Sequence, residues 1–473
     1  MIILGTNSVK DTGYDVDNSV RVQTGAYMSG SNGTATNNDK YTISFWVKRG
    51  KLTGTTQFII EGFSGALNDT GFGCIRFRNT DVLDIQGYNA TYARTNRIFR
   101  DISAWYHIVV AYDTTLGTAD DRVKLYINGV EETSLSVKDN PTQNQNTGLN
   151  NNSAAINFFR RRIQSSNDLH GNGYFSEFCM IDGQALDATS FGEFDEDSGI
   201  WKPIDVSGLT FGNNGFYLET KQSGTSQNSS GLGADTSGND NHFAVNNLTA
   251  IDQSTDTCTN NFATINSLDN YFYASTLSEG NLKQTCNSGN YSFNTSTFGL
   301  SQGKWYVEVK VSGSNMRNAI GITDKVSTGT TNALETLPNG WSYQQGEVYN
   351  NSSVVANLGT FSSGNIVGIY LDLDNNKLYF AINGTIQNSG TGLSITAPAS
   401  TTNGNYFFAF GDNASSNSDV NEVNFGSPSF TISSGNTDAN GYGNFEYNPS
   451  SGTFDGASKD FYALNTKNLA EYG

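Results

Sequence analysis

Apolar and polar residues alternate along much of this chain with a period of two, the pattern of β-strands that bury one face. No window of ten or more residues carries a helical period, and only residues 187–194 are expected to form a short helical turn. The pattern therefore predicts an antiparallel β-protein built from many short strands. The clearest strands are expected at residues 41–48, 105–113, 304–311 and 367–374.

Two predicted strands end in closely similar turn sequences. The first reads K-L-Y-I-N-G at residues 124–129, and the second reads K-L-Y-F-A-I-N-G at residues 377–384. Asn-Gly after an alternating apolar run is the strongest short-range signal for a tight hairpin. Because the two copies lie in different halves of the chain, we expect the same hairpin once in each of two separate β-domains.

Composition supports this organisation. The chain has 473 residues, enough for several domains, and its 12% aromatic and 15% charged residues indicate a folded protein rather than a disordered one. The fold class is therefore all-β, with two antiparallel β-sandwiches. The aromatic residues spaced through the last forty positions are expected to dock on a neighbouring subunit or on another protein of the same assembly. The expected parts are a sandwich at residues 1–220, an irregular linker at 221–270, a second sandwich at 271–430 and a C-terminal tail at 431–473.

The formal net charge is −18, which opposes nucleic-acid binding because such binding depends on clustered Lys and Arg. The basic run at residues 160–162 is interpreted as structural or salt-bridging, with an anion site as the alternative. No apolar stretch approaches the ~18 residues of a membrane helix, and the N-terminal sequence lacks the basic and apolar regions of a signal peptide. We therefore expect no nucleic-acid partner, no membrane insertion, and synthesis in a cytoplasm without export.

The cysteines are spaced too widely for a metal knuckle. They are expected to be buried thiols, although one disulfide could form if Cys258 and Cys286 meet. The other two cysteines are Cys74 and Cys179.

Several segments of the first half resemble the laminin-G/concanavalin A-like lectin superfamily, in the version found in phage structural proteins. They are residues 41–50, 99–115, 122–129, 174–194 (with I-D-G-Q-A-L-D) and 235–243 (D-T-S-G-N-D-N-H-F). Segments of the second half resemble SPRY-type domains, another family of concanavalin-like sandwiches. They are residues 303–309 (G-K-W-Y-V-E-V), 319–323, 341–343, 364–373, 378–384 and 424–426. Residues 255–270 and 441–473 are similar to segments of marine phage virion proteins.

This resemblance implies two concanavalin A-like jelly rolls in a phage virion protein that is exposed as a tail fibre, appendage or capsid fibre. It also implies a virion location, synthesis in the host cytoplasm, other virion proteins as partners, and a homo-oligomer. No heptad stretch is present for a coiled-coil trimer, so oligomer contacts are expected from sandwich faces or from the tail.

Catalytic chemistry has few candidates. Glycosidases need two carboxylates on either side of the scissile bond, and Glu193, Asp195 and Asp197 alternate as such acids would. However, Ser198 stands where a laminarinase-like signature requires its last glutamate, so a solvated acidic loop is the preferred interpretation. Nucleophilic triads need a base beside Ser or Cys, and no nucleophile elbow lies near any of the three histidines, which are His107, His170 and His242. We expect no enzyme activity, with a polysaccharide depolymerase as a remote alternative.

Calcium is the one cofactor that the sequence suggests. The laminin-G resemblance implies a calcium ion at a loop rim, and calcium takes carboxylate, amide and carbonyl oxygens. The loop at residues 235–241 supplies these oxygens, and Asp182 or Asp187 could add another ligand. Asx-rich turns also occur for backbone reasons alone, and this alternative stays open. The candidate ligands are Asp235, Asn239, Asp240 and Asn241.

Sugar sites on lectin-like sandwiches place an aromatic platform beside polar side chains. Trp341 could equally be a core residue. The candidate ligand-binding residues are Tyr88, Tyr92 and Arg94 in the first sandwich, and Trp341, Tyr343 and Gln345 in the second. The function expected from the sequence is therefore a non-enzymatic virion surface protein that binds host-surface glycans, with a purely structural decoration protein as the alternative.

Overall fold

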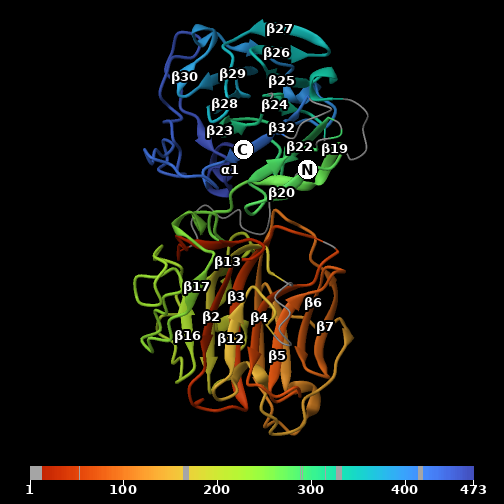
Figure 1. Cartoon of the computed structure of the whole chain (residues 1–473), viewed down its shortest axis with the longest axis vertical. Helices are drawn as coiled ribbons and strands as arrows, with labels where there is room; N and C mark the ends of the chain where they lie inside the picture. The colour runs from red at the N-terminus through yellow and green to blue at the C-terminus, as the bar shows by residue number, and fades with distance from the viewer. Residues whose placement is uncertain are drawn as a thin grey trace. The chain divides into compact units, whose positions relative to one another are not determined.

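The computed structural model describes residues 13–473 except 53, 163–169, 288, 290, 315, 326–332 and 414–418. The chain divides into two compact units (Figure 1), the first comprising Gly5–Asn260 and the second containing Asn261–Gly473. The described secondary structure is nearly all β, as the alternation predicts. Each unit is described separately below.

The first unit is a sandwich of two antiparallel sheets. Sheet 1 has the order β10 (Val130–Glu131), β9 (Val123–Ile127), β8 (Trp105–Asp113), β3 (Lys40–Arg49), β13 (Gly173–Asp182), β1 (Ser19–Val22) and β18 (Gln253–Ser254), with β16 (Phe216–Leu218) also paired to β13. Sheet 2 has the order β11 (Leu135–Val137), β7 (Thr91–Ile98), β6 (Val82–Gly87), β5 (Phe72–Phe77), β4 (Gln57–Phe63), β12 (Ala155–Phe158), β2 (Tyr27–Ser31) and β17 (Ala244–Asn246). A separate ribbon pairs β14 (Gly192–Phe194) with β15 (Trp201–Pro203).

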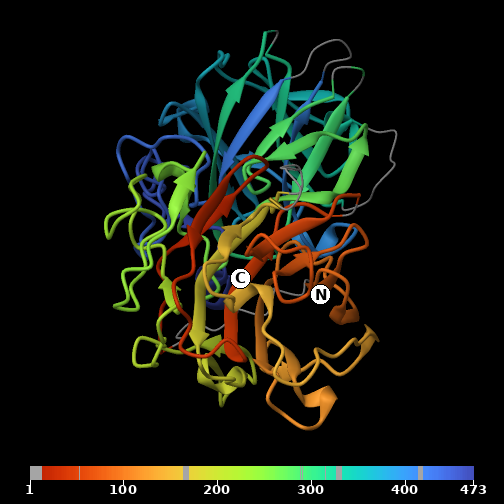
Figure 2. The same ribbon diagram turned by 60° about the horizontal axis from the view of Figure 1, so that its bottom comes forward.

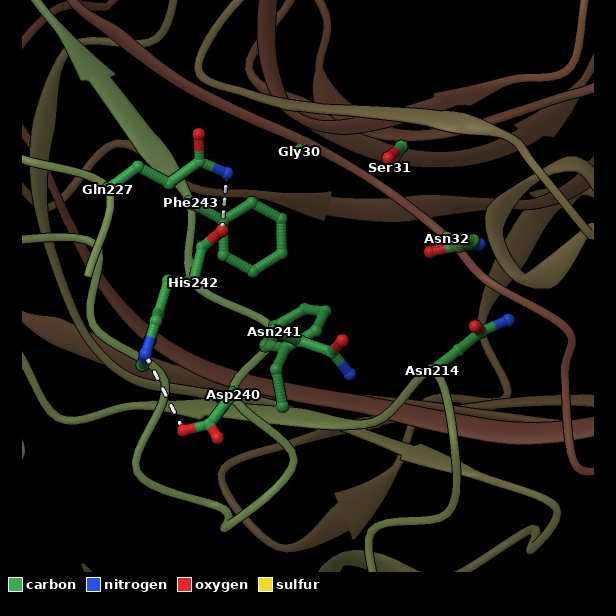
Figure 3. Close-up of a pocket in the computed structure, with 10 residues that line it drawn as sticks. Gly30, Ser31, Asn32, Asn214, Gln227, Asp240, Asn241, His242 and Phe243 are labelled. Carbon is green, nitrogen blue, oxygen red and sulfur yellow. Dashed lines mark hydrogen bonds and ion pairs between the residues drawn. The ribbon is translucent and has the colours of Figure 1, made fainter. Parts of the chain in front are cut away.

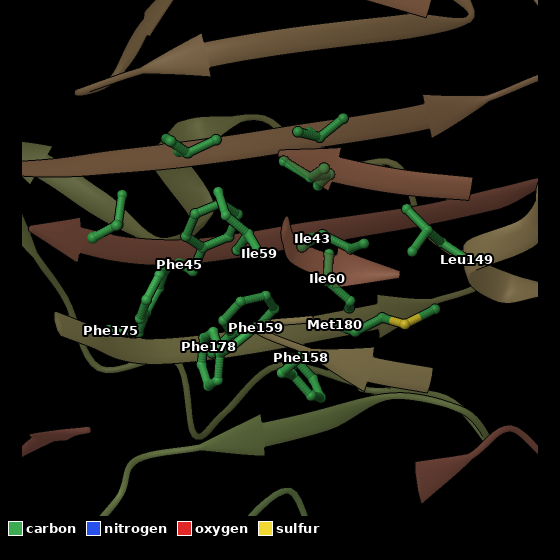
Figure 4. Packing of buried hydrophobic residues seen from close by; sticks show 14 of the residues in the cluster. Ile43, Phe45, Ile59, Ile60, Leu149, Phe158, Phe159, Phe175, Phe178 and Met180 are labelled. Carbon is green, nitrogen blue, oxygen red and sulfur yellow. The ribbon is translucent and has the colours of Figure 1, made fainter. Parts of the chain in front are cut away.

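The core of the first unit lies between sheets 1 and 2 (Figure 4). Ile43 and Phe45 of β3 and Phe178 of β13 meet Ile60 of β4 and Phe158 of β12. The intervening positions of β3 are also buried, because a second apolar cluster covers the outer face of sheet 1. The alternation therefore identified the two faces of β3 but not that both are covered.

The second unit is also a sandwich of two sheets. Sheet 3 has the order β19 (Ile265–Phe272), β22 (Ser292–Ser296), β32 (Phe407–Asp412), β24 (Asn318–Thr323), β25 (Gly340–Gln344), β26 (Glu347–Asn350) and β27 (Ser353–Asn357). Sheet 4 has the order β20 (Thr276–Ser278), β21 (Lys283–Thr285), β33 (Val420–Asn424), β23 (Lys304–Ser312), β28 (Ile366–Asp372), β29 (Lys377–Ile382) and β30 (Thr385–Ile386), with β31 (Leu393–Ser394) on β29 and β34 (Tyr462–Ala463) parallel to β23. Its core, between the sheets, includes Trp305, Ile320 and Phe410.

Helical structure is limited to one α-helix and short turns in the part of the chain that is described. Helix α1 (Thr466–Tyr472) is capped by the Asn465 side chain, which accepts from the backbone N–H of Asn468. The single-turn 3-10 segments lie at Ala119–Asp121, Gly148–Asn150, Ala188–Ser190, Ala250–Asp252, Leu334–Thr336, Asn388–Gly390 and Pro398–Ser400. The short turn expected within residues 187–194 is therefore confirmed. No helix among the described residues is long and apolar enough to cross a membrane.

Both Asn-Gly hairpins are confirmed, and both are built in the same way. Asn128 (φ 48°) and Gly129 (φ 81°) join β9 to β10, while Asn383 (φ 48°) and Gly384 (φ 76°) join β29 to β30. Positive φ at both central residues is the type I′ geometry that Asn-Gly favours. Each Asn side chain also accepts a backbone N–H from the neighbouring strand, that of His107 in the first unit at 2.7 Å and that of Ile366 in the second at 3.0 Å.

Residues 221–270, expected as a linker, contain strands that pair within the two units. Strand β17 pairs with β2, β18 pairs with β1, and β19 pairs with β22. Figure 2 shows β2 in red between the yellow β12 and the yellow-green β17. The Gly, Ser and Asn residues of this region mark long surface loops of the first sandwich, so low apolar content alone misplaced the boundary.

The expected docking tail packs on its own sandwich instead. Phe445, Phe454 and Phe461 are buried against Tyr306 and Tyr370 on the outer face of sheet 4. These aromatic rings are covered within the unit, so they present no free surface to a neighbouring subunit.

All four cysteines are buried free thiols, and no disulfide joins Cys258 to Cys286. The basic run is structural in the part described: Arg160 donates to Asn157 and stacks on Tyr27, with its guanidinium carbon 3.4 Å from the ring centre.

Candidate functional site

Three of the six predicted sugar-binding residues are buried. The exposed fraction is 1% for Tyr92, 4% for Trp341 and 0% for Tyr343. Trp341 and Tyr343 belong to the core of the second sandwich, and the Tyr343 hydroxyl donates to the Gly359 carbonyl. Because a stacking platform needs an exposed ring face, Tyr92 and Tyr343 are corrected to core packing, and for Trp341 the core alternative is confirmed.

The other three predicted residues are accessible but already have protein partners. Tyr88 packs edge-on against Phe72. Arg94 binds both carboxylate oxygens of the buried Asp84, with Nε 2.7 Å from Oδ1. Gln345 accepts a hydrogen bond from the exposed Arg317 guanidinium at 2.9 Å, at the turn between β25 and β26. Each of these three side chains therefore already makes a contact within its own unit.

His107 makes contacts that look like those of a Ser-His pair. Its Nε2 lies 2.8 Å from Ser44 Oγ, and its Nδ1 accepts from Trp201 Nε1 at 3.0 Å. An indole N–H can only donate, so the neutral imidazole carries its proton on Nε2 and donates it to the serine. Burial lowers the pKa of His107 to about 3, which keeps the ring neutral. His107 therefore cannot remove the Ser44 proton as a triad base does.

The acidic segment at residues 193–197 also lacks the features of a glycosidase pair. Lys202 Nζ lies 3.4 Å from both Glu193 Oε1 and Asp195 Oδ2. Hydrogen bonds from the Ser198 hydroxyl and backbone N–H lower the pKa of Asp195, whereas a general acid needs a raised pKa. The segment is an exposed ribbon edge with its charge partly neutralised by Lys202.

The predicted calcium loop is held together by one of its own carboxylates. Asp235 Oδ1 accepts the backbone N–H groups of Tyr217 and Ser237, and Oδ2 accepts from the Ser237 hydroxyl and the Asn241 N–H, all at 2.8–2.9 Å. Asn239 and Asn241 donate their amides to backbone carbonyls of residues 212–215. The loop is thus ordered by Asx-turn bonds, and calcium at this rim stays a prediction.

The two additional candidate ligands have protein partners as well. Asp182 accepts four hydrogen bonds, from the backbone N–H groups of Thr36, Asn37 and Asn214 and from the Asn150 amide. Asp187 caps the turn at Ala188–Ser190. Among the described residues, no group of three or more His, Cys, Asp or Glu side chains is placed to hold a metal ion.

A cavity of about 210 Å³ opens beside this loop in the first unit (Figure 3). Strand β2, the segment before β16 and the segment before β17 form it. Phe243 lies against β2 at Gly30, where an added Cβ would come within 2.7 Å of the ring, so the glycine is required for this close approach. The lining residues are Gly30, Ser31, Asn32, Asn214, Phe216, Gln227, Asp240, Asn241, His242 and Phe243.

The amide of Asn214 is oriented by a chain of hydrogen bonds that starts at Asp182. A carboxylate can only accept, so the Asn150 amide nitrogen faces Asp182, at 2.8 Å. The Asn150 oxygen then accepts the Asn214 amide nitrogen at 3.1 Å. Asn214 is 3% exposed, and its Oδ1 has no hydrogen-bond partner among the described residues. In Figure 3 this oxygen lies on the side of Asn214 that faces Asn32.

Other lining groups also present acceptors. The Asn32 and Asn241 nitrogens are used by backbone carbonyls, which leaves both side-chain oxygens available. His242 Nδ1 accepts the Asp235 N–H, so its Nε2 carries the proton and lies 3.6 Å from an Asp240 carboxylate oxygen. The cavity thus combines several oxygen acceptors with one imidazole N–H donor over an aromatic floor.

Sequence reasoning identified part of this cavity for another purpose. Asp240 and Asn241 were expected as calcium ligands, and His242 was considered only as a catalytic base. Asn32, Asn214 and Gln227 were missed, because they come from segments far apart in sequence. Asn32 and Asn214 each carried a local turn signal, since they lie in G-S-N-G and G-N-N-G sequences.

Comparison with known families matches each unit to one domain type. Residues 22–164 match the concanavalin A-like lectin/glucanases superfamily, and residues 304–418 match the SPRY domain. Concanavalin A-like and SPRY domains are therefore both present in this chain. Comparison with curated proteins gives no match.

Solved structures similar to parts of the chain share little sequence with it. The SPRY domain of human HERC1 is 14% identical with a TM-score of 0.29, covering 34% of this chain and 96% of that one. A protein from Bacteroides ovatus, described as an inferred carbohydrate binding protein, is 14% identical with a TM-score of 0.36, covering 50% of this chain and 60% of that one. A pentraxin from Limulus polyphemus is 12% identical with a TM-score of 0.27, covering 37% and 79%.

Proposed function

We propose that this chain is a non-catalytic phage virion surface protein that binds a host-surface glycan in the cavity beside β2 and β17. The single observation that carries the glycan proposal is the composition of that cavity. Its amide and carboxylate oxygens can accept hydrogen bonds from sugar hydroxyls, while His242 offers a donor. The volume is below the ~300–1,000 Å³ of sites for drug-sized ligands, which suits a single sugar unit.

Support for the virion setting comes from the sequence. Residues 255–270 and 441–473 resemble marine phage virion proteins, and the concanavalin A-like and SPRY matches agree with a surface module that binds. The absence of a competent base at His107 and of a raised carboxyl pKa at Asp195 favours binding over catalysis. The proposed setting is a tail fibre, appendage or capsid fibre, made in the host cytoplasm and assembled as a homo-oligomer with other virion proteins.

A glycan array and host-cell adsorption test the binding proposal. Asp240→Asn and Gln227→Ala change exposed lining groups and should reduce retention at least tenfold without unfolding the protein. Glu193→Gln changes an exposed carboxylate of the same unit outside the cavity and serves as the matched control. Equal retention of all three variants and the unmodified protein would place the binding site elsewhere.

Two further measurements separate the alternatives. Immunogold labelling of particles should find the protein at the tail or the capsid, and its absence from purified virions would refute the virion proposal. Incubation with host polysaccharide should release no reducing ends. Release that is lost in Glu193→Gln would instead establish a depolymerase, and no glycan retention at all would favour a decoration protein without a ligand.

A further inference from the structure

A set of buried amide side chains lies between the two sheets of the second unit. Asn294 and Asn318 come from sheet 3, and Gln284 and Asn421 come from sheet 4. All four are fully buried. Their orientations matter because an amide oxygen can only accept a hydrogen bond and an amide nitrogen can only donate one.

Backbone carbonyls fix these orientations. The Gln284 nitrogen donates to the Phe410 carbonyl at 2.9 Å, so its oxygen is the group that accepts from Asn421. The Asn421 nitrogen also donates to the Gly411 carbonyl, which leaves its oxygen to accept from Asn318 at 2.9 Å. The Asn318 nitrogen donates to the Val420 carbonyl as well. Asn318 Oδ1 therefore remains an acceptor, and no described residue donates to it.

Two carboxyl groups beside Asn318 also have a buried oxygen without a hydrogen-bond partner among the described residues. Asp412 Oδ1 accepts from the Ser292 backbone and hydroxyl at 3.3 Å, but its buried Oδ2 has no partner among the described residues. Asp419 Oδ2 accepts the Arg317 backbone N–H at 2.7 Å, and its Oδ1 likewise has none. The exposed fractions are 4% for Asp412 and 0% for Asp419, so water does not solvate these charges freely.

The backbone brings the three side chains together. Asn318 and Asp412 are directly paired across β24 and β32, which puts their side chains on one face of the sheet with Cβ atoms about 5 Å apart. Asp419 is held beside Asn318 by the neighbouring Arg317 N–H. Gly313 makes room for it, since an added Cβ there would lie 1.7 Å from Asp419 Oδ1.

The region thus holds two buried carboxyl groups and one carboxamide, and each has one oxygen without a hydrogen-bond partner among the described residues. The neighbouring Arg317 guanidinium bonds to Gln345 at the surface. Buried polar groups without a partner destabilise the folded state, and buried charges do so more strongly. A positively charged ligand would offset this destabilisation.

We propose that Asp412, Asp419 and the Asn318 carboxamide oxygen bind a divalent cation of the calcium class in the second unit. Calcium takes oxygen ligands in flexible geometry, and water or backbone carbonyls would supply the remaining positions. Two carboxylates match its charge. The site is distinct from the loop at Asp235, whose carboxylate already accepts four hydrogen bonds.

Isothermal titration of the full chain with calcium chloride, after dialysis against chelator and then chelator-free buffer, tests this proposal. Calcium should bind, and Asp412→Asn or Asp419→Asn should weaken that binding at least tenfold. Asp374→Asn removes an exposed carboxylate of the same unit and is the matched control. Asp240→Asn removes the exposed carboxylate of the other candidate loop, so it should bind as the unmodified protein does.

Hydrogen exchange of the unmodified protein gives a readout that needs no variant. Calcium should increase protection in peptides that cover β32 and β33. The proposal is overturned if calcium gives neither heat nor added protection. That result is expected if a proton, and not a cation, neutralises Asp412 and Asp419. The proposal is equally overturned if only Asp240→Asn abolishes binding.

Discussion

Replacing Glu177 by Gln should remove a pH-dependent penalty on the stability of the first unit. Glu177 lies in an irregularity of β13, where its carboxylate accepts from the Tyr14 hydroxyl at 3.2 Å and from the Tyr217 hydroxyl. Burial raises the pKa of Glu177 to about 7, partly offset by the Tyr217 hydrogen bond, with the nearby Glu219 charge adding to the rise. The ordinary pKa is 4.5.

The sign and size of this effect on the free energy of unfolding follow from proton linkage. Between pH 4.5 and 7 the folded protein holds this proton while the unfolded chain releases it, so the free energy of unfolding falls as pH rises. A shift from 4.5 to about 7 corresponds to about 3 kcal/mol by the top of that window. The glutamine side chain would keep the shape of Glu177 and accept from Tyr217 without a charge. The variant should therefore match the unmodified protein near pH 4.5 and exceed its stability by about 3 kcal/mol at about pH 8.

Calorimetry of both proteins from about pH 4.5 to 8 measures the difference directly, because other titrating groups cancel in the subtraction. Glu193→Gln, at an exposed ribbon position, is the matched control and should leave the pH profile unchanged. The reasoning fails if the difference between Glu177→Gln and the unmodified protein is independent of pH, or if the variant loses stability as pH rises.

Three further variants test other contacts. Asp235→Asn should lower the free energy of unfolding by roughly 2 kcal/mol, because the amide would face four donors. The variant should also lose glycan retention, and a variant as stable as the unmodified protein by calorimetry would contradict this reasoning. Phe454→Ala should lower the free energy of unfolding by about 3–5 kcal/mol by opening a cavity under the C-terminal segment, and calorimetry should show the loss in the unfolding of the second unit. Gly384→Ala should lower the free energy of unfolding by about 1–2 kcal/mol from the positive φ alone, and by more because its Cβ would lie 2.5 Å from the Tyr447 ring. A melting temperature unchanged from that of the unmodified protein would refute that contact.

The alternation pattern predicted strands and hairpins well because their geometry is local. Val123, Leu125 and Ile127 needed only a two-residue period and the following Asn-Gly to be placed on one face of a hairpin. The same pattern could not say whether the opposite face is covered. It therefore left open whether Trp341 forms a binding platform or packs in the core, where both Trp341 and Tyr343 lie.

The candidate sites depend on hydrogen-bond direction, which sequence does not carry. Asn214 is an acceptor in the cavity only because Asp182 orients Asn150, and these three residues lie in separate segments. Asn318 is an acceptor only because the Asn421 nitrogen is already used. An Asx-rich loop, in contrast, is visible in sequence, but its carboxylate proved to be satisfied by its own backbone.

An aromatic ring from a later segment of the same unit packs against the glycine of each Asn-Gly hairpin. An added Cβ on Gly129 would lie 2.3 Å from Trp201, and one on Gly384 would lie 2.5 Å from Tyr447. The turns can form early, within microseconds, because the two strands that each turn joins are adjacent in sequence. The rings arrive only after long loops have closed, which is the slow part of β-sandwich folding. During synthesis the strand edge of each hairpin would therefore stay exposed until its ring is made and packed. Ribosome-bound chains that stop before Trp201 or Tyr447 should be the species most prone to strand mispairing.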